Sequence, residues 1–127
     1  MRDDCIPRGE IGSNLVAEIL SDPENLCVAH VLNLCEVFYN FHRAGGSEVA
    51  ASAMKDLSLG GVVERAEITT AFWQTVGTLK LVHRRVSLAD CFAVALANQL
   101  GATVLTADHH EFDAMARQSV CSVRFIR

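Results

Sequence analysis

Glu36 is an acidic residue in a segment where a carboxylate needs a partner. Residues 31–41 are apolar nearly all round a helix, so we expect this helix to be buried and its polar groups to be compensated. Asn33 and Asn40 precede and follow Glu36 by about one helical turn, which places the three side chains on one polar stripe. The stripe indicates a functional carboxylate. A solvated helix edge, or an ion pair between Glu36 and Arg43, would explain the same pattern.

Two aspartates stand at the ends of predicted elements. Asp90 lies in the sequence Ser87-Leu-Ala-Asp90 at the start of a helix predicted over 88–100, and this S-x-x-D spacing also fits a capping box. Asp108 follows a strand predicted over 103–106. It therefore belongs to the carboxyl end of that strand, where open parallel sheets bind ligands, although an N-cap of the next helix would explain it too.

The chemistry of these three acids depends on whether the fold brings them together. Carboxylates that converge repel each other, and a site that collects them normally holds a divalent cation. Hard oxygen ligands without a pattern of Cys or His favour magnesium or manganese over zinc. We therefore predict that Glu36, Asp90 and Asp108 meet at the carboxyl edge of a parallel sheet and bind Mg or Mn there.

The elements that position these acids alternate along the chain. The first segment, 1–9, has three charges, a proline and no apolar alternation, and is predicted to be irregular. Helices are predicted over 13–21, 31–43, 47–59, 68–83 and 88–100, with strands over 26–29, 62–63, 103–106 and 120–126. Apolar strands separated by helices predict an α/β fold, a mostly parallel sheet with helices on both faces. The length of 127 residues fits a single domain, 1–127.

Composition excludes several classes of protein. With 50% hydrophobic and 20% charged residues the chain is not disordered, and its longest apolar run, 91–97, is far below the ~20 residues that span a bilayer. We expect a cytoplasmic protein without a membrane segment. The net charge of -4 opposes loose binding of nucleic acid, so RNA must be engaged locally. Five cysteines without a C-x-x-C pattern are expected to be reduced and mostly buried, with no structural zinc site.

Two joined motifs resemble a known family. The run Ser87-Leu-Ala-Asp90-Cys-Phe-Ala-Val-Ala-Leu-Ala97, followed by Leu100-Gly-Ala-Thr-Val-Leu-Thr-Ala-Asp108-His-His-Glu-Phe-Asp113, is similar to the C-terminal signature of PIN domains, particularly the VapC-type toxin ribonucleases. Asn33-Leu-Cys-Glu36-Val resembles the family's second acidic motif. The resemblance implies a PIN-like three-layer sandwich and a metal-dependent endoribonuclease. Glu36, Asp90 and Asp108 then take the positions of the family's metal-binding acids.

The resemblance also implies further roles and partners. Thr106 is placed as a polar support beside the acids, and Asp113 as a more peripheral acid or an exposed helix residue. RNA is the implied substrate, hydrolysed at its phosphodiester bonds by a metal-activated water. An antitoxin protein or a second copy in a homodimer is expected on the apolar faces of 13–21 and 47–59. The basic run 83–85 either contacts RNA phosphates or forms a solvated turn.

One feature departs from the family pattern. In the family, the first acid closes an apolar strand that opens the chain and occupies the middle of the sheet, whereas this chain begins MRDDCIPRG. We therefore expect that the first strand and its acid are missing, and that Asp3 or Asp4 replaces that acid only by accident of position. The start codon then lies inside a longer reading frame, or the chain is a remnant.

Two other functions compete with the nuclease. A phosphoacceptor receiver domain would need an apolar strand before Asp3-Asp4 and a further acid at a strand end midway along the chain, and neither is visible. The stronger alternative is a non-catalytic PIN-like binding module that keeps the acids for structural reasons. Uptake of magnesium or manganese distinguishes this module from a nuclease.

Overall fold

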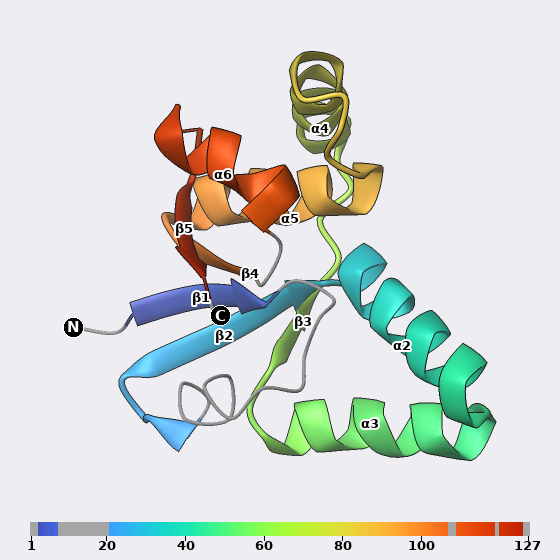
Figure 1. Cartoon of the computed structure of the whole chain (residues 1–127). Helices are drawn as coiled ribbons and strands as arrows, with labels where there is room; N and C mark the ends of the chain where they lie inside the picture. The colour runs from blue at the N-terminus through green and yellow to red at the C-terminus, as the bar shows by residue number, and fades with distance from the viewer. Residues whose placement is uncertain (1–2, 8–20, 107–108, 119, 126–127) are drawn as a thin grey trace.

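The chain folds around a sheet of parallel strands. The computed structural model describes residues 3–7, 21–106, 109–118 and 120–125 (Figure 1). Its elements in chain order are β1 (Asp3–Pro7), β2 (Asn25–His30), α2 (Val31–Gly45), α3 (Ser47–Leu59), β3 (Val63–Arg65), α4 (Thr70–Val82), α5 (Leu88–Leu100), β4 (Thr103–Thr106), α6 (His109–Arg117) and β5 (Ser122–Phe125). The strand order is β3-β2-β1-β4-β5, and every neighbouring pair is parallel.

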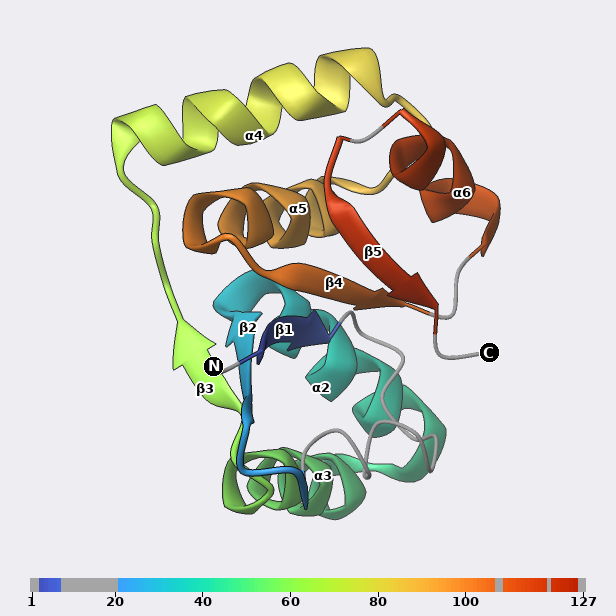
Figure 2. The same ribbon diagram turned by 90° about the vertical axis from the view of Figure 1, so that its left-hand side faces the viewer.

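The helices cover both faces of this sheet, as the sequence predicted. Figures 1 and 2 place α4, α5 and α6 on one side and α2 and α3 on the other. The predicted bounds 47–59, 88–100 and 103–106 agree with α3, α5 and β4. The α/β fold class is therefore confirmed. The helix predicted over 13–21 lies, up to residue 20, outside the described residues.

The prediction for the first segment is wrong where the structure describes it. Residues 3–7 form β1, which pairs with β2 on one side and with β4 on the other and so occupies the centre of the sheet. This is the place where we expected a strand to be missing. Sequence pattern failed because β1 is held by backbone pairing on both edges and carries only a short apolar stretch, so it shows no alternation.

The core lies around α5. Its residues from Asp90 to Ala97 are all buried, because the sheet lies beneath this helix and α2 and α4 pack beside it. Ser87 begins the helix as N-cap, and Gly101 ends it with a positive φ of 64°, a left-handed conformation that costs glycine little. In the described parts of the chain, no helix is long and apolar enough to cross a bilayer.

The cysteines differ from expectation at one position. Cys27 is disulfide-bonded, and Cys5 is the residue opposite it in the β1–β2 register. Reading all five cysteines as reduced was therefore wrong for Cys27, because that interpretation assumed that no strand forms at residues 3–7. Cys91 and Cys121 are free and buried, whereas Cys35 is free and exposed. Burial raises the pKa of the Cys121 thiol to about 11.

Candidate functional site

Asp90 is a buried carboxylate at the amino end of α5. Only 1% of its surface is exposed. Its backbone N–H donates to the Ser87 Oγ at 3.1 Å, which confirms the first half of the capping box predicted from S-x-x-D. The cap fixes where α5 starts, and with it the position of the Asp90 side chain. A carboxylate at such depth is tolerated only with compensating donors or cations.

Asn33 lies beside this carboxylate's helix and joins it to α2. Its side chain is 1% exposed, and its Nδ2 donates to the backbone oxygen of Ala89 at 3.1 Å. The Asn33 Oδ1 is buried and accepts no hydrogen bond within the described part of the chain. Because α2 begins directly after β2, this bond holds the amino end of α5 near the carboxyl edge of the sheet.

Glu36 lies about one turn further along α2 than Asn33, but it is exposed. The expectation of a buried helix here is wrong, since α2 buries only Asn33 and Val37. Helical periodicity placed the polar stripe correctly yet overestimated how much of the apolar surface the sheet and α3 cover. Arg43, the alternative partner of Glu36, has its guanidinium 5.6 Å from the centre of the Tyr39 ring.

The third predicted acid, Asp108, lies outside the described residues, and so does the side chain of Thr106. The backbone of β4 ends at Thr106, on the same edge of the sheet as the end of β2. Convergence of the three acids therefore stays a prediction. Asp113, on α6, is partly buried and not fully exposed.

The β1 register decides where Asp3 and Asp4 stand. Asp3 is opposite Asn25 and Asp4 is opposite Leu26, at the start of β2. In a parallel sheet this is the amino edge, whereas ligands bind at the carboxyl edge. The backbone positions of Asp3 and Asp4 are thus at the wrong edge to replace the first acid of the family, and the residue that ends β1 is Pro7.

The described residues contain only part of a metal site. Among them, no group of three or more His, Cys, Asp or Glu side chains is placed to hold a metal ion. The donors that are described nevertheless fit a hard cation, because the Asp90 carboxylate and the bond-free Oδ1 of Asn33 are buried oxygens near one edge of the sheet.

His30 is a buried polar residue of this edge that sequence reasoning missed. It ends β2, caps α2 by accepting from the Leu32 N–H at 3.1 Å through Nδ1, and bonds the Glu67 backbone oxygen at 2.9 Å through Nε2. Since Nδ1 accepts, Nε2 carries the proton. Its ring lies 5.7 Å from Phe72 and 4.9 Å from Phe92. The available signal was its position between a predicted strand and a predicted helix.

Glu67 connects this histidine to an ion pair before α4. The Arg65 guanidinium bonds the Glu67 carboxylate. Partial burial acts to raise the pKa of Glu67, but the hydrogen bond and charge of Arg65 outweigh it, so the pKa lies below its usual 4.5. His30 thereby ties β2 and α2 to the segment that leads into α4.

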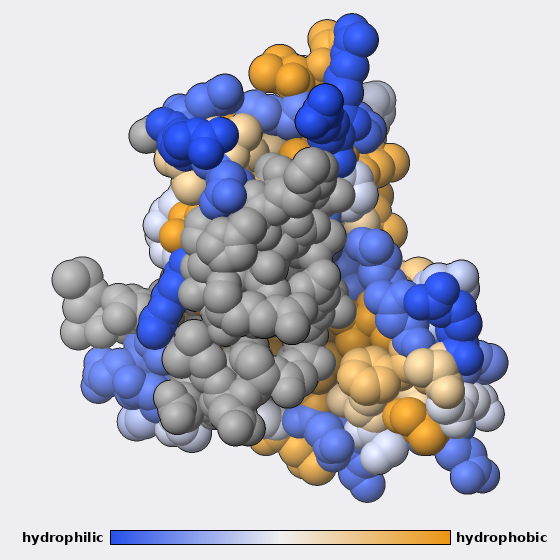
Figure 3. Space-filling view, in the orientation of Figure 1, coloured by the Kyte–Doolittle hydropathy of each residue, from blue (hydrophilic) through white to orange (hydrophobic). Residues whose placement is uncertain are grey.

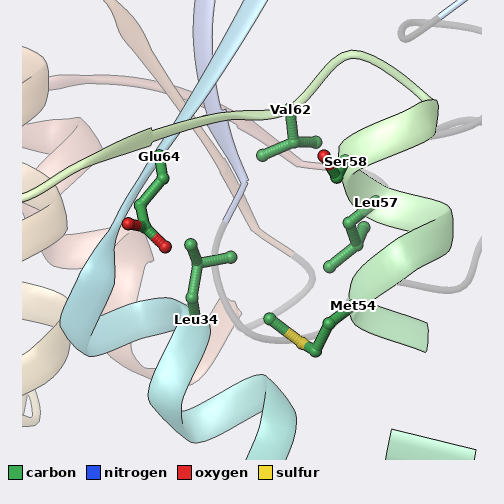
Figure 4. A pocket seen from close by; sticks show the side chains of 6 residues that line it. All are labelled: Leu34, Met54, Leu57, Ser58, Val62 and Glu64. Carbon is green, nitrogen blue, oxygen red and sulfur yellow. The ribbon is translucent and has the colours of Figure 1, made fainter. Parts of the chain in front are cut away.

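A separate cavity of about 200 Å³ opens between α2, α3 and β3 (Figure 4). It is lined by Leu34, Met54, Leu57, Ser58, Val62 and Glu64. Apart from Ser58 and Glu64 this lining is apolar, which suits neither a metal ion nor a phosphate. The cavity is therefore distinct from the site around Asp90.

Solved structures share this fold at low sequence identity. VapBC-1 of nontypeable Haemophilus influenzae is 13% identical over 96% of this chain and 97% of that chain, with a TM-score of 0.70. VapC20 of Mycobacterium tuberculosis, a toxin that cleaves the Sarcin-Ricin loop, is 16% identical over 87% of this chain and 94% of its own, with a TM-score of 0.67. VapBC2 of Rickettsia felis, bound to a DNA fragment from its promoter, is 14% identical over 98% and 99%, with a TM-score of 0.66.

No curated protein sequence matches the chain. The match to a family description is broader. It begins at the second residue of β1 and continues past the end of α6, so it includes all three predicted acids. The chain therefore belongs to the PIN domain family, whose model matches residues 4–118.

Proposed function

We propose that this PIN domain is a metal-dependent endoribonuclease that hydrolyses RNA phosphodiester bonds, and that it is the toxin of a toxin–antitoxin pair. The observation that carries the proposal is the buried carboxylate of Asp90, fixed by the Ser87 cap and flanked by Asn33 at the sheet edge where ligands bind. The solved structures of similar fold include a toxin that cleaves RNA of the Sarcin-Ricin loop.

Three acids are assigned to the site. Asp90, Glu36 and Asp108 hold Mg or Mn, with Asp90 as the buried member and Glu36 as the solvent-facing one. Such a cation, when bound, activates a water and offsets charge on the phosphate and the leaving oxygen. Asn33 orients the amino end of α5, and thereby Asp90, through its bond to Ala89. The exposed side of Glu36 leaves the site open to a long polymer.

The partners follow from this role. An RNA substrate places the protein in the cytoplasm. An antitoxin protein is proposed because several structures of similar fold are toxin–antitoxin complexes. We also propose that the chain forms a homodimer.

The deciding experiment separates metal binding by Asp90 from its capping role. Asp90→Asn keeps a side chain of the same shape but lacks the charge that a hard cation requires. We expect manganese-supported RNA cleavage to fall by more than the roughly 10–100-fold loss typical of an outer-shell partner. The melting temperature should change little. Asp56→Asn, an exposed carboxylate on α3, is the matched control and should retain wild-type cleavage.

The non-catalytic module is the alternative that this experiment excludes or supports. Full cleavage by Asp90→Asn removes Asp90 from the metal site. If the wild-type protein neither cleaves RNA nor shows heat of manganese binding in calorimetry, the module is the better description. A large loss of stability in Asp90→Asn with binding retained assigns this residue to capping alone.

A further inference from the structure

The outer face of α4 carries more apolar surface than this chain covers. The helix packs chiefly on α5 and buries only Phe72 and Val76. Trp73 is 47% exposed, Leu81 66% and Val82 68%. In Figure 3, hydrophobic atoms accordingly reach the surface at the upper end of the molecule, over α4. Single exposed apolar residues are ordinary, but several on one helix face mark an interaction surface.

The same face is nearly free of charge. Lys80 is the only charged residue of α4, and its Nζ donates to the backbone oxygens of Arg84 at 2.7 Å and Val86 at 2.8 Å. Its charge is thus used to hold the turn after the helix. Depletion of charge and enrichment of aromatic residues characterise the centre of protein interfaces. By contrast, the outer face of α3 exposes Leu59 among Glu48, Lys55 and Asp56.

Gly77 lies in the middle of α4 without a reason inside the chain. Glycine in a helix interior costs about 1 kcal/mol relative to alanine. A Cβ at Gly77 would meet no atom within 4 Å, so no neighbour in the described structure requires its absence. A missing side chain on an exposed face permits the close approach of another backbone from outside.

The residues around Gly77 are arranged symmetrically. Trp73 precedes it and Leu81 follows it by the same four positions, so all three lie on one face of the helix. Two such helices crossing antiparallel at Gly77 would bring Trp73 against the partner subunit's Leu81, and Leu81 against the partner subunit's Trp73. This is the self-complementary pattern of an interface with two-fold symmetry.

Charges beyond the ends of α4 fit the same arrangement. Glu64 and Glu67 precede the helix, whereas Arg84 and Arg85 follow it. An antiparallel crossing places the basic end of one helix toward the acidic end of the other. Charge complementarity of this kind fixes the register and orientation of partners.

We propose that α4 is the homodimer interface, in which α4 packs antiparallel on α4 of a second copy across a two-fold axis at Gly77. This inference deepens the homodimer part of the proposed function and does not depend on nuclease activity. It replaces the faces of 13–21 and 47–59 as the expected dimer surface.

The test uses one charge placed at the axis and one placed beside it. Gly77→Arg puts two like charges against each other in the dimer, and should weaken dimerisation at least about tenfold in sedimentation equilibrium. Arginine also favours a helix over glycine, so the melt of the variant monomer should not fall. Thr75→Arg adds the same charge to an exposed position on another side of α4, and should dimerise like wild type.

Trp73 provides a second readout, since it is the only tryptophan of the chain. Its emission should shift to longer wavelength on dilution of the wild type and of Thr75→Arg, but not of Gly77→Arg. A dimer that persists in Gly77→Arg overturns the α4 surface and leaves the homodimer. A monomeric wild type at all concentrations overturns both, while RNA cleavage by that monomer leaves the nuclease proposal intact. Displacement of the dimer by an antitoxin protein bound at Trp73 also overturns the assignment.

Discussion

The helices α4 and α5 are alike in sequence and opposite in environment. Each has 13 residues, is mostly apolar and contains one charged residue, Lys80 in α4 and Asp90 in α5. Yet α5 buries every residue from Asp90 to Ala97, while α4 buries two. The difference arises because α5 lies directly on the sheet and α4 lies on α5, as the second layer above it (Figure 2). Apolar composition therefore predicts the need for cover, not the source of it.

Matched leucine deletions should show the largest energetic difference between these helices. Leu96→Ala removes a side chain that is fully buried in α5, and should cost roughly 2–5 kcal/mol of unfolding free energy. Leu81→Ala removes the same group from α4 where it is 66% exposed, and should stay within about 0.5 kcal/mol. Urea melts at a low protein concentration, where the monomer is measured, compare the two. Equal costs would mean that α4 is covered within a single chain.

This contrast shows why the elements could be predicted and their burial could not. The caps Ser87 and Gly101 bound α5 by local chemistry, so its range followed from the sequence. The burial of Glu36 did not follow, because periodicity identifies a stripe and not the neighbour that covers it. The strand β1 escaped prediction for a related reason, since its central place depends on β2 and β4 and not on its own pattern.

The candidate site shows the same division. Asp90 was found from its motif and is buried at a helix start, as a local rule expects. Asn33 was found as part of a stripe, but its bond to Ala89 joins residues far apart in sequence. His30 was missed because its second partner, Glu67, is supplied by the segment after β3. Long-range partners of polar groups are what a single sequence withholds.

Asn33→Ala should have the next largest effect, because it breaks the bond between α2 and the buried end of α5. We expect a loss of about 1–3 kcal/mol in unfolding free energy, typical of disrupting a buried polar pair. Asn40→Ala, on the same stripe of α2 but exposed, is the matched control and should be near neutral. Comparable losses in both variants would show that α5 is fixed by its apolar contacts alone.

The smallest effect is expected before α4, at the ion pair of Glu67. Because Arg65 holds the pKa of Glu67 below its usual 4.5, this carboxylate stabilises the fold above that pH and loses its contribution as the pH falls through the lowered value. With both side chains partly exposed, the contribution should be at most about 1 kcal/mol. Urea melts from neutral to acid pH should therefore show wild type falling toward Glu67→Gln as the pH drops below 4.5. Glu64→Gln, which removes an exposed carboxylate from β3, should keep the wild-type profile. A constant gap between wild type and Glu67→Gln across this range would show that the Glu67 side chain acts through its shape and not through its charge, and that the start of α4 is held by the backbone bond to His30 alone.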